Sequence, residues 1–234
     1  MFPSTRRSVL LAARDADPEV RRQALGALID SYWKPVYKYL RVQHRAEGDE
    51  ARDLTQSFFA LALEKGTFDR YDPVKARFRT FLRVCLDGFA ANERKAALRQ
   101  KRGGGAALLS LDFEGAEAEL DRSPSSDLTP EEYFHREWVR ALFAHAVERL
   151  RASCEDRPAR FLLFERYDLE EPGERPTYAD LGRELGMTAV QVTNDLAAAR
   201  REFRRLVLEE LRALTGSDAE FRAEARDVLG VDPP

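Results

Sequence analysis

Apolar residues recur at intervals of three and four along nearly the whole chain, and the alternation typical of strands is almost absent. One run continues through Leu25, Leu28, Ile29, Tyr32, Trp33, Val36, Tyr39 and Leu40. This interval matches the 3.6-residue period of an α-helix, in which such residues share one face. We therefore predict an all-α fold of two helical domains joined by an acidic flexible linker.

Capping residues and glycines mark where the helices begin and end. We expect helices from Pro18, over 49–65, over 78–102, from Pro130, over 159–169, on both sides of Gly186 and over 218–229. Between them, residues 103–129 are rich in Gly, Ser, Pro and acids. The predicted domains are 1–102 and 130–215, with a linker over 103–129 and a short helical tail over 216–234.

Charge is divided unevenly among these segments. Residues 1–110 hold 21 Lys and Arg against 13 Asp and Glu, whereas residues 111–132 hold one Arg against 8 acids. The remaining residues hold 16 basic against 20 acidic side chains, and the whole chain has a net charge of −3. The first segment is basic, the second is acidic and the third has mixed charge, which indicates that the three segments have separate roles.

Composition favours a helix-rich cytoplasmic protein. Hydrophobic residues make up 44% and charged residues 34% of the 234 residues, and no apolar run approaches the ~20 residues of a membrane span. The N-terminus carries no pattern that we interpret as a signal peptide. Cys85 and Cys154 are isolated cysteines within apolar helical patterns, so we expect buried thiols in a reducing compartment.

The segment TYADLGRELGMTAVQVTNDLAAARREFRRL has the spacing of a helix-turn-helix. Thr177 with Asp180, and Thr188 with Gln191, each form a capping-box pattern. The outward face of the second helix would read base edges and hold phosphates. The residues predicted to contact DNA are Thr188, Gln191, Thr193, Asn194, Arg200, Arg201 and Arg205. An ordinary helical hairpin is the alternative, and Asp195 on the flank disfavours DNA.

The segment FRTFLRVCLDGFAANERKAALRQKRGGG combines an apolar stripe with a basic end. Cations in a last turn suit the helix dipole, but that explains only two or three of them. The further DNA-binding residues that we predict are Arg77, Arg79, Arg83, Asn92, Arg94, Lys95, Arg99, Lys101 and Arg102. The neighbouring rings of Phe68, Tyr71, Phe78 and Phe81 suit stacking on unpaired bases.

The helix over 49–65 is apolar on two faces. Leu54, Phe58 and Leu61 form one stripe, while Gln56, Phe59 and Leu63 lie roughly opposite. Such a helix is either sandwiched inside a bundle, which we favour on this pattern alone, or docks a partner.

Taken in order, these three segments resemble the extracytoplasmic-function (ECF) subgroup of the sigma-70 family of bacterial RNA polymerase sigma factors. EARDLTQSFFALALEK is similar to region 2.2, the basic helix to regions 2.3 and 2.4, and the helix-turn-helix to region 4.2. The resemblance implies docking on core RNA polymerase through Asp49, Glu50, Asp53, Leu54, Gln56 and Phe59. It also implies promoter DNA as a partner, with unpaired −10 bases at regions 2.3 and 2.4, a flipped base at the loop Gly66–Arg77, and the −35 element at region 4. The linker would then follow a positively charged cleft of the polymerase.

Several residues depart from the family pattern. Asp87, Gly88 and Asp195 each subtract from DNA contact, whereas Arg52 and Ser57 replace customary acids of region 2.2. These departures support an alternative, a helical transcriptional adaptor with degenerate promoter contacts. Phosphorylation of Thr55 or Ser57 would restore about −1.5 to −2 of charge, so a regulatory kinase joins an anti-sigma factor among the partners to consider.

An enzyme finds little support in the sequence. His44, His135 and His145 lack metal-ligand spacing, and we expect them to be solvated surface residues. The linker acids lie in a segment too flexible to hold an acid–base pair. We expect no catalytic residue, metal or cofactor. The tail helix over 218–229 is expected to pack back on the second domain or to meet a partner.

Overall fold

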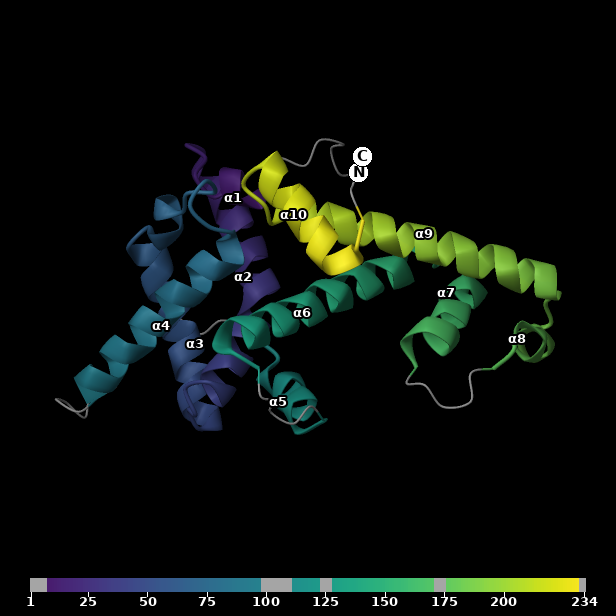
Figure 1. The fold of residues 1–234 in the computed structure, drawn as a ribbon, viewed down its shortest axis with the longest axis horizontal. Helices are drawn as coiled ribbons and strands as arrows, with labels where there is room; N and C mark the ends of the chain where they lie inside the picture. Colours follow the sequence, from purple (N-terminus) through teal and green to yellow (C-terminus); the bar gives the residue numbers. More distant parts are fainter. Residues whose placement is uncertain (1–7, 98–110, 123–127, 171–175, 232–234) are drawn as a thin grey trace. The chain divides into compact units, whose positions relative to one another are not determined.

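The computed structural model describes residues 8–97, 111–122, 128–170 and 176–231 (Figure 1). All regular secondary structure in these ranges is helical, which confirms the predicted all-α class. None of the helices within the described ranges combines the length and apolarity needed to cross a bilayer.

The order of elements follows the predicted helices closely. The first half contains α1 (Val9–Ala12), α2 (Pro18–Val42), α3 (Gly48–Glu64), the 3-10 turn η1 (Thr67–Arg70), α4 (Phe78–Ala97) and α5 (Phe113–Arg122). The second half contains α6 (Pro130–Ser153), α7 (Pro158–Phe164), the π-helical turn η2 (Glu165–Leu169), α8 (Tyr178–Leu185), α9 (Ala189–Ala213) and α10 (Asp218–Leu229). The predicted helix start at Pro18 is confirmed, and Asp17 caps it, because its side chain accepts a hydrogen bond from the Glu19 amide.

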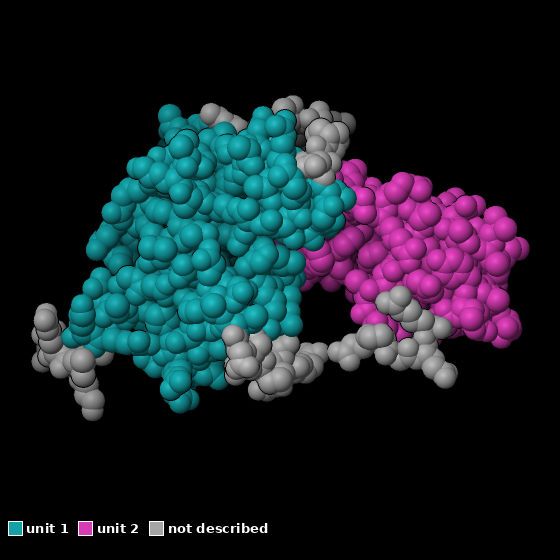
Figure 2. Space-filling model, in the orientation of Figure 1, with its two compact units in different colours: residues 1–141, 211–234 teal, residues 142–210 magenta. Residues whose placement is uncertain are grey.

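The chain divides into two compact units, coloured separately in Figure 2. Unit 1 comprises residues 1–141 and 211–234, and unit 2 comprises residues 142–210. The boundaries between the units fall inside α6 and α9, and not in the predicted linker over 103–129. The C-terminal helix α10 therefore belongs to unit 1.

Aromatic side chains dominate the core of unit 1. Tyr32 of α2 contacts Phe78 of α4 edge to face, with ring centroids 5.3 Å apart, and stacks on Trp138 of α6 at 6.4 Å. Phe58 of α3 lies 5.5 Å from Phe89 of α4. Each of these side chains is buried, so α2, α3, α4 and the first half of α6 share one hydrophobic core.

The acidic segment is more ordered than the sequence led us to expect. Residues 113–122 form α5, whose Phe113 ring packs on Trp33 and Tyr37 of α2 at 5.4 and 5.0 Å. Glu117 pairs with Arg41, and Glu119 pairs with Lys34 and Lys38. Apolar burial and opposite charge therefore hold α5 on α2. The other parts of the predicted linker, 103–110 and 123–127, lie outside the described residues.

Candidate nucleic-acid interface

Unit 2 contains the predicted helix-turn-helix, formed by α8 and α9. The Thr177 side chain accepts from the Asp180 amide while the Asp180 carboxylate accepts from the Thr177 amide, which confirms the first capping box. The second pair behaves alike, since the Thr188 amide donates to Gln191 Oε1 at 2.8 Å and the Gln191 amide donates to Thr188 Oγ1 at 3.3 Å. Both helix starts are thus fixed by local hydrogen bonds.

A close backbone approach sets the angle of the turn. The Met187 amide donates to the Gly182 carbonyl oxygen at 2.7 Å, and Gly186 takes the left-handed conformation at φ 66°. A Cβ on Gly182 would lie 2.5 Å from the Met187 carbonyl oxygen. Gly182 is therefore a positioning residue that our reading of the sequence missed, although a glycine inside a predicted helix was a signal for close approach.

The interior of the helix-turn-helix holds α9 in place. Leu163 of α7, Leu181 of α8, and Val192 and Leu196 of α9 form one buried cluster, against which Tyr167, Tyr178, Leu185 and Met187 pack. Thr188, just before α9, is exposed, and so are the following residues of its first turns: Ala189, Val190, Gln191, Thr193 and Asn194. This is the surface predicted to meet DNA, and Val190 is 69% exposed.

Asp195 does not share that outward face. Its carboxylate accepts two hydrogen bonds from Arg160 of α7, at 3.0 and 2.8 Å, and its side chain is 19% exposed. The acid that disfavoured DNA in the sequence is therefore neutralised inside unit 2. The Asp195 charge therefore does not oppose DNA at the candidate base-reading side chains.

The arginines of α9 fall into two groups. Arg200 is held by Asp168 through two hydrogen bonds of 2.8 Å and lies over the Tyr167 ring, while Arg205 pairs with Glu202 and Glu209. Arg201 and Arg204 are exposed, and neither has an ion-pair partner among the described residues. Of the predicted DNA-binding arginines on this helix, Arg201 is thus the one already available to a phosphate. Arg204, which was not among the predicted residues, is available in the same way.

The basic residues around α4 are also mostly engaged. Arg77 pairs with Asp227 and with Glu224 at 3.4 Å, and Arg79 donates to Glu224 at 2.8 Å. Arg83 pairs with Asp87 at 2.9 Å. Farther along the helix, Asn92 and Lys95 are exposed. The predicted sites at Arg99, Lys101 and Arg102 lie outside the described residues.

The aromatic side chains near α4 do not form an exposed stacking platform, contrary to our expectation. Phe68, Tyr71 and Phe78 are buried, and the Tyr71 ring lies 5.1 Å from Phe78 and 5.5 Å from the half-buried Phe81. Phe78 and Phe81 belong to α4, and Phe68 of η1 and Tyr71 just after it pack against Phe78, so the rings contact one another instead of solvent. A base could not stack on them without opening that core.

The predicted polymerase-docking residues of α3 separate into exposed and buried sets. Asp49, Glu50 and Asp53 are exposed and Leu54 is half-buried, whereas Gln56 and Phe59 are 8% and 0% exposed. The sandwich interpretation of this helix is therefore correct for Gln56 and Phe59, which a partner cannot contact directly. Thr55 is also fully buried, and its hydroxyl donates to the Ala51 carbonyl oxygen at 2.7 Å. A kinase could not reach that hydroxyl in this fold.

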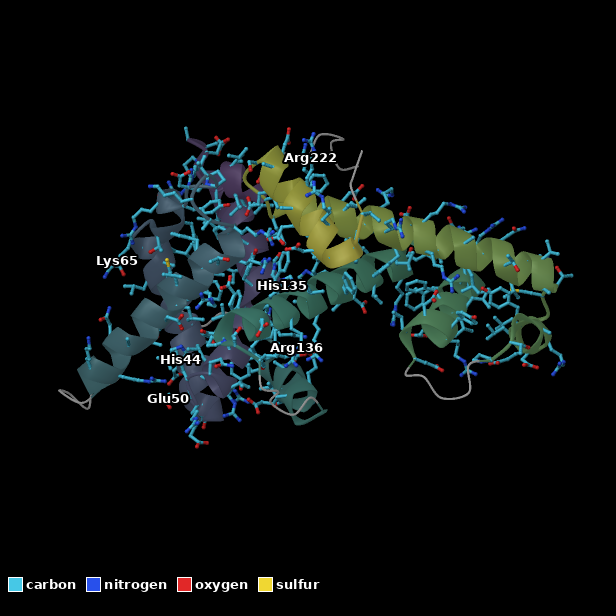
Figure 3. The ribbon with its side chains drawn as sticks, in the orientation of Figure 1. His44, Glu50, Lys65, His135, Arg136 and Arg222 are labelled. Carbon is cyan, nitrogen blue, oxygen red and sulfur yellow. The ribbon has the colours of Figure 1, made fainter. Side chains whose placement is uncertain are left out.

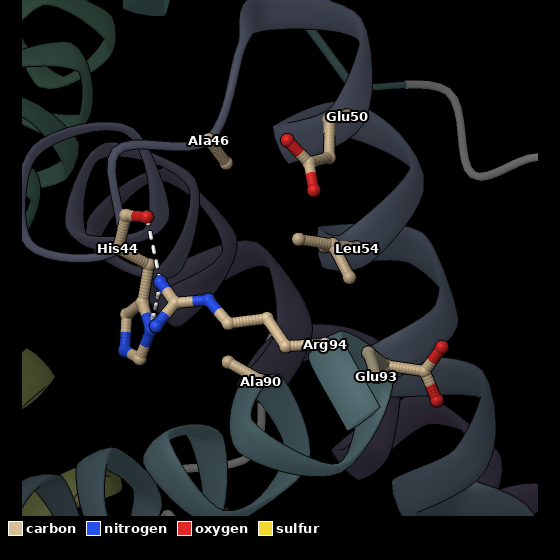
Figure 4. A pocket seen from close by; sticks show the side chains of 7 residues that line it. All are labelled: His44, Ala46, Glu50, Leu54, Ala90, Glu93 and Arg94. Atoms are coloured by element: carbon tan, nitrogen blue, oxygen red, sulfur yellow. Dashed lines mark hydrogen bonds between the residues drawn. The ribbon is translucent and has the colours of Figure 1, made fainter. Parts of the chain in front are cut away.

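A cleft borders the exposed part of α3 (Figure 4). It has a volume of about 480 Å³ and is lined by Glu50 and Leu54 of α3, by Ala90 and Arg94 of α4, and by His44 and Ala46 of the loop after α2. Arg94 donates to the His44 carbonyl oxygen at 2.6 Å and to its Nδ1 at 3.1 Å. The opening thus offers an apolar floor beside a carboxylate and a fixed guanidinium.

A second cleft, of about 360 Å³, lies among α3, η1 and α4. Phe58 and Phe89 contribute to its apolar wall. Its polar rim holds two cations and one acid, and consists of Lys65, Thr67, Arg70, Asn92 and Glu93. The half-buried Cys85 also lines this cleft, while Cys154 is buried, so the expectation of buried thiols holds fully only for Cys154. Cations around an apolar hollow suit an anionic ligand with a flat ring.

The histidines are less solvated than the sequence suggested. His44 Nε2 lies 2.9 Å from Asp87 Oδ1, with 13% of the His44 side chain exposed. His135 (Figure 3) is half-buried beside Trp138, and burial followed by the Arg79 charge lowers its pKa. The structure shows no group of three potential metal-binding side chains within the ranges it describes.

The acids of α10 contact the candidate site, and the sequence alone did not single them out. Glu220, Glu224 and Asp227 follow the i, i+4, i+7 spacing of one helix face, and that face meets Phe78, Arg77 and Arg79. The tail thus packs on the start of α4 in unit 1. The spacing of the acids was visible, but their partners lie about 150 positions earlier in the chain.

Comparison with family models, curated proteins and solved structures found no match.

Proposed function

We propose that this chain is an ECF-type sigma factor, which binds core RNA polymerase and directs promoter-specific initiation of transcription. The observation that carries the proposal is the exposed start of α9, where Gln191 and Asn194 precede Arg201 on a helix fixed by two capping pairs and a close turn. Gln and Asn can each form two hydrogen bonds with adenine, and Arg can hold phosphate. This face is the candidate reader of the −35 element.

Unit 1 supplies the remaining contacts of the proposal. Asp49, Glu50 and Asp53 present an acidic stretch of α3 beside the cleft of Figure 4, which suits a basic partner with an apolar side chain. The second cleft, with Lys65 and Arg70 at its rim, is the candidate site for a flipped base of the −10 element. The resemblance of α3 and α4 to regions 2.2 to 2.4 links these two features to one activity.

The second candidate function is a helical adaptor that binds polymerase but reads promoters poorly. One observation favours it: Arg77, Arg79, Arg83, Arg200 and Arg205 all have carboxylate partners within the chain. A cation engaged in this way contributes less to phosphate binding, because its existing partner must first be displaced.

Co-elution with bacterial core RNA polymerase tests the first part of the proposal. We expect the full chain to co-elute, and a Glu50→Lys/Asp53→Lys variant to elute separately, because charge reversal opposes the acidic docking face. Both positions are exposed, so the variant should fold. An Asp30→Lys/Glu148→Lys variant, also at exposed positions, changes net charge equally and should still co-elute.

Transcription in vitro separates the two candidates. A sigma factor, added to core polymerase with a library of promoter fragments from its host, yields transcripts from a subset of them. An adaptor co-elutes with polymerase but yields none. Loss of co-elution in both double variants, or in neither, would contradict the docking face on α3.

A further inference from the structure

The last helix of the chain holds the arginines that precede and begin α4. Glu220 accepts hydrogen bonds from the Phe78 and Gly216 amides, each at 2.7 Å. Glu224 accepts from Arg79, and Asp227 pairs with Arg77. The α10 carboxylates therefore occupy two cations that the sequence assigns to nucleic acid, and they also cap the first turn of α4.

Charge dominates this attachment. The buried residues of α10 are Glu220, Glu224 and Ala225, so alanine is its only fully buried apolar side chain. By contrast, α5 buries Phe113 against two aromatic rings of α2. Full burial of one large apolar side chain contributes about 1.5–3 kcal/mol. Helix α10 gains only part of such a contribution, because Phe221, Val228 and Leu229 are half-buried.

Buried ion pairs compensate only partly for the removal of their charges from water. Glu224 is 2% exposed, and burial raises the pKa of its carboxyl despite the charges of Arg79 and Arg77. The carboxylate is thus not fully stabilised where it lies. A competing anion that pairs with Arg77 and Arg79 would replace these contacts.

Carboxylate and phosphate make similar demands on arginine, since both accept paired hydrogen bonds from its planar group. Lys75 and Arg70 are exposed and come just before Arg77 in the sequence, and Lys75 pairs with its near neighbour Asp72 at 3.5 Å. Arg70, Lys75, Arg77 and Arg79 lie in one short segment of the sequence, and without α10 this basic strip has no carboxylate of that helix beside it. A single-stranded phosphate backbone fits such a strip.

We propose that α10 is an internal competitor for nucleic acid, which occupies Arg77 and Arg79 with Glu224 and Asp227 until a single-stranded phosphate backbone replaces them. The inference rests on the proposed function, because it regulates the α4 side of the same promoter contact. If α10 competes in this way, the full chain binds single-stranded nucleic acid more weakly than it would with Arg77 and Arg79 free of their α10 partners.

Equilibrium binding to a labelled single-stranded oligonucleotide, longer than the roughly 16 nucleotides that one binding domain covers, tests the inference. The test variant is Glu224→Gln/Asp227→Asn in the full chain. The matched control is Asp30→Asn/Glu64→Gln, which removes the same charge from exposed positions of unit 1. We expect the test variant to bind at least about fivefold tighter than the control, the lower end of a usual coupling between sites.

Equal affinity of the two variants would overturn the competition while leaving the proposed function intact. Absence of binding by all three proteins, to this oligonucleotide and to duplex DNA, would overturn both. Circular dichroism of each variant establishes that the helices have formed. If a variant unfolds, the inference is tested by hydrogen exchange of the unaltered chain, which needs no substitution.

Hydrogen exchange of the unaltered chain reports the release of α10 directly. With oligonucleotide present, we expect the amides of residues 218–229 to exchange at least about threefold faster, while those of α5 keep their rates. Unchanged exchange in α10 at saturating oligonucleotide would overturn the inference. Equal release by poly-glutamate at the same charge concentration would overturn the assignment to nucleic acid.

Discussion

Asp87 joins three parts of unit 1 through one carboxylate. It accepts from the Tyr39 hydroxyl at 3.0 Å and from Arg83 at 2.9 Å, and it contacts His44. Burial acts to raise the pKa of Asp87, but the hydrogen bonds from His44 and Tyr39 and the Arg83 charge outweigh it and hold the pKa below its ordinary value. The residue that departs from the family pattern is therefore a structural acid of α4.

Replacement of Asp87 by Asn should lower the free energy of unfolding at pH 7 by on the order of 1 kcal/mol, with allowance for solvent screening. Because the folded pKa is depressed, this contribution is present above the unfolded pKa and is lost as the pH falls below about 4. Urea unfolding at pH 7 and at about pH 3 would show the difference shrinking. An equal difference at both values would contradict the ionic role.

Gly182 sets the turn between α8 and α9 through its lack of a Cβ. Gly182→Ala should destabilise unit 2 by about 1–3 kcal/mol, because backbone atoms must shift to relieve the contact with Met187. Gly26→Ala is the matched control: nothing lies within 4 Å of its Cβ position, so it should stabilise α2 by about 0.5–1 kcal/mol. Thermal unfolding followed by hydrogen exchange in each helix would compare the two.

At the scale of the element, the position of α5 depends on a buried cation. Lys38 is 2% exposed and pairs with Glu119 of α5 and with Glu137 of α6, itself 3% exposed. Lys34 pairs with Glu119, lies over the Trp33 ring and is 26% exposed in its side chain. Lys38 thus lies inside an ion-pair network that connects α2, α5 and α6, while Lys34 lies at the edge of this network.

Lys38→Met should lower the free energy of unfolding by about 1–3 kcal/mol, because the buried Glu137 carboxylate loses one of its three cationic partners and keeps Arg136 and Arg140. Lys34→Met should lower it by less than about 1 kcal/mol, as for a partly solvated pair. Hydrogen exchange should also show α5 protected in the second variant and unprotected in the first. Similar losses in the two variants would contradict the distinction between them.

Local chemistry made most elements predictable from the sequence. Asp17, Thr129, Thr177 and Ser217 each accept a hydrogen bond from the first turn that follows, and these caps were legible as residue types. Helix α5 was not, because its short acidic sequence gains stability from Trp33, Tyr37 and the lysines of α2 rather than from its own pattern. Tertiary contacts of that kind have no local signal.

At the scale of the whole molecule, the candidate site was predictable in part. The helical periodicity of α9 correctly separated Val192 and Leu196, which are buried, from Gln191 and Asn194, which are exposed. It could not say which arginines are occupied, because Asp168 and Asp227 approach from other elements. Nor could it show that the C-terminal helix belongs with the first helices in unit 1.

Binding to duplex DNA should report which cations are available. Arg201→Ala/Arg204→Ala should reduce the slope of log affinity against log salt by about 1.8, the value for two lost phosphate contacts. Arg200→Ala/Arg205→Ala removes the same charge from positions already paired with carboxylates, and should change the slope much less. Affinity measured at several salt concentrations gives both slopes, and equal changes would contradict the division of α9.

Unit 1 is discontinuous along the chain, since residues 1–141 are completed by residues 211–234. During synthesis the ribosome must add about 70 further residues between the two parts, which takes roughly 4–14 s at ordinary translation rates. Throughout that interval Arg77 and Arg79 have no α10 carboxylate beside them. A nascent chain, or one ended by a premature stop, would therefore display the basic strip that the finished protein covers.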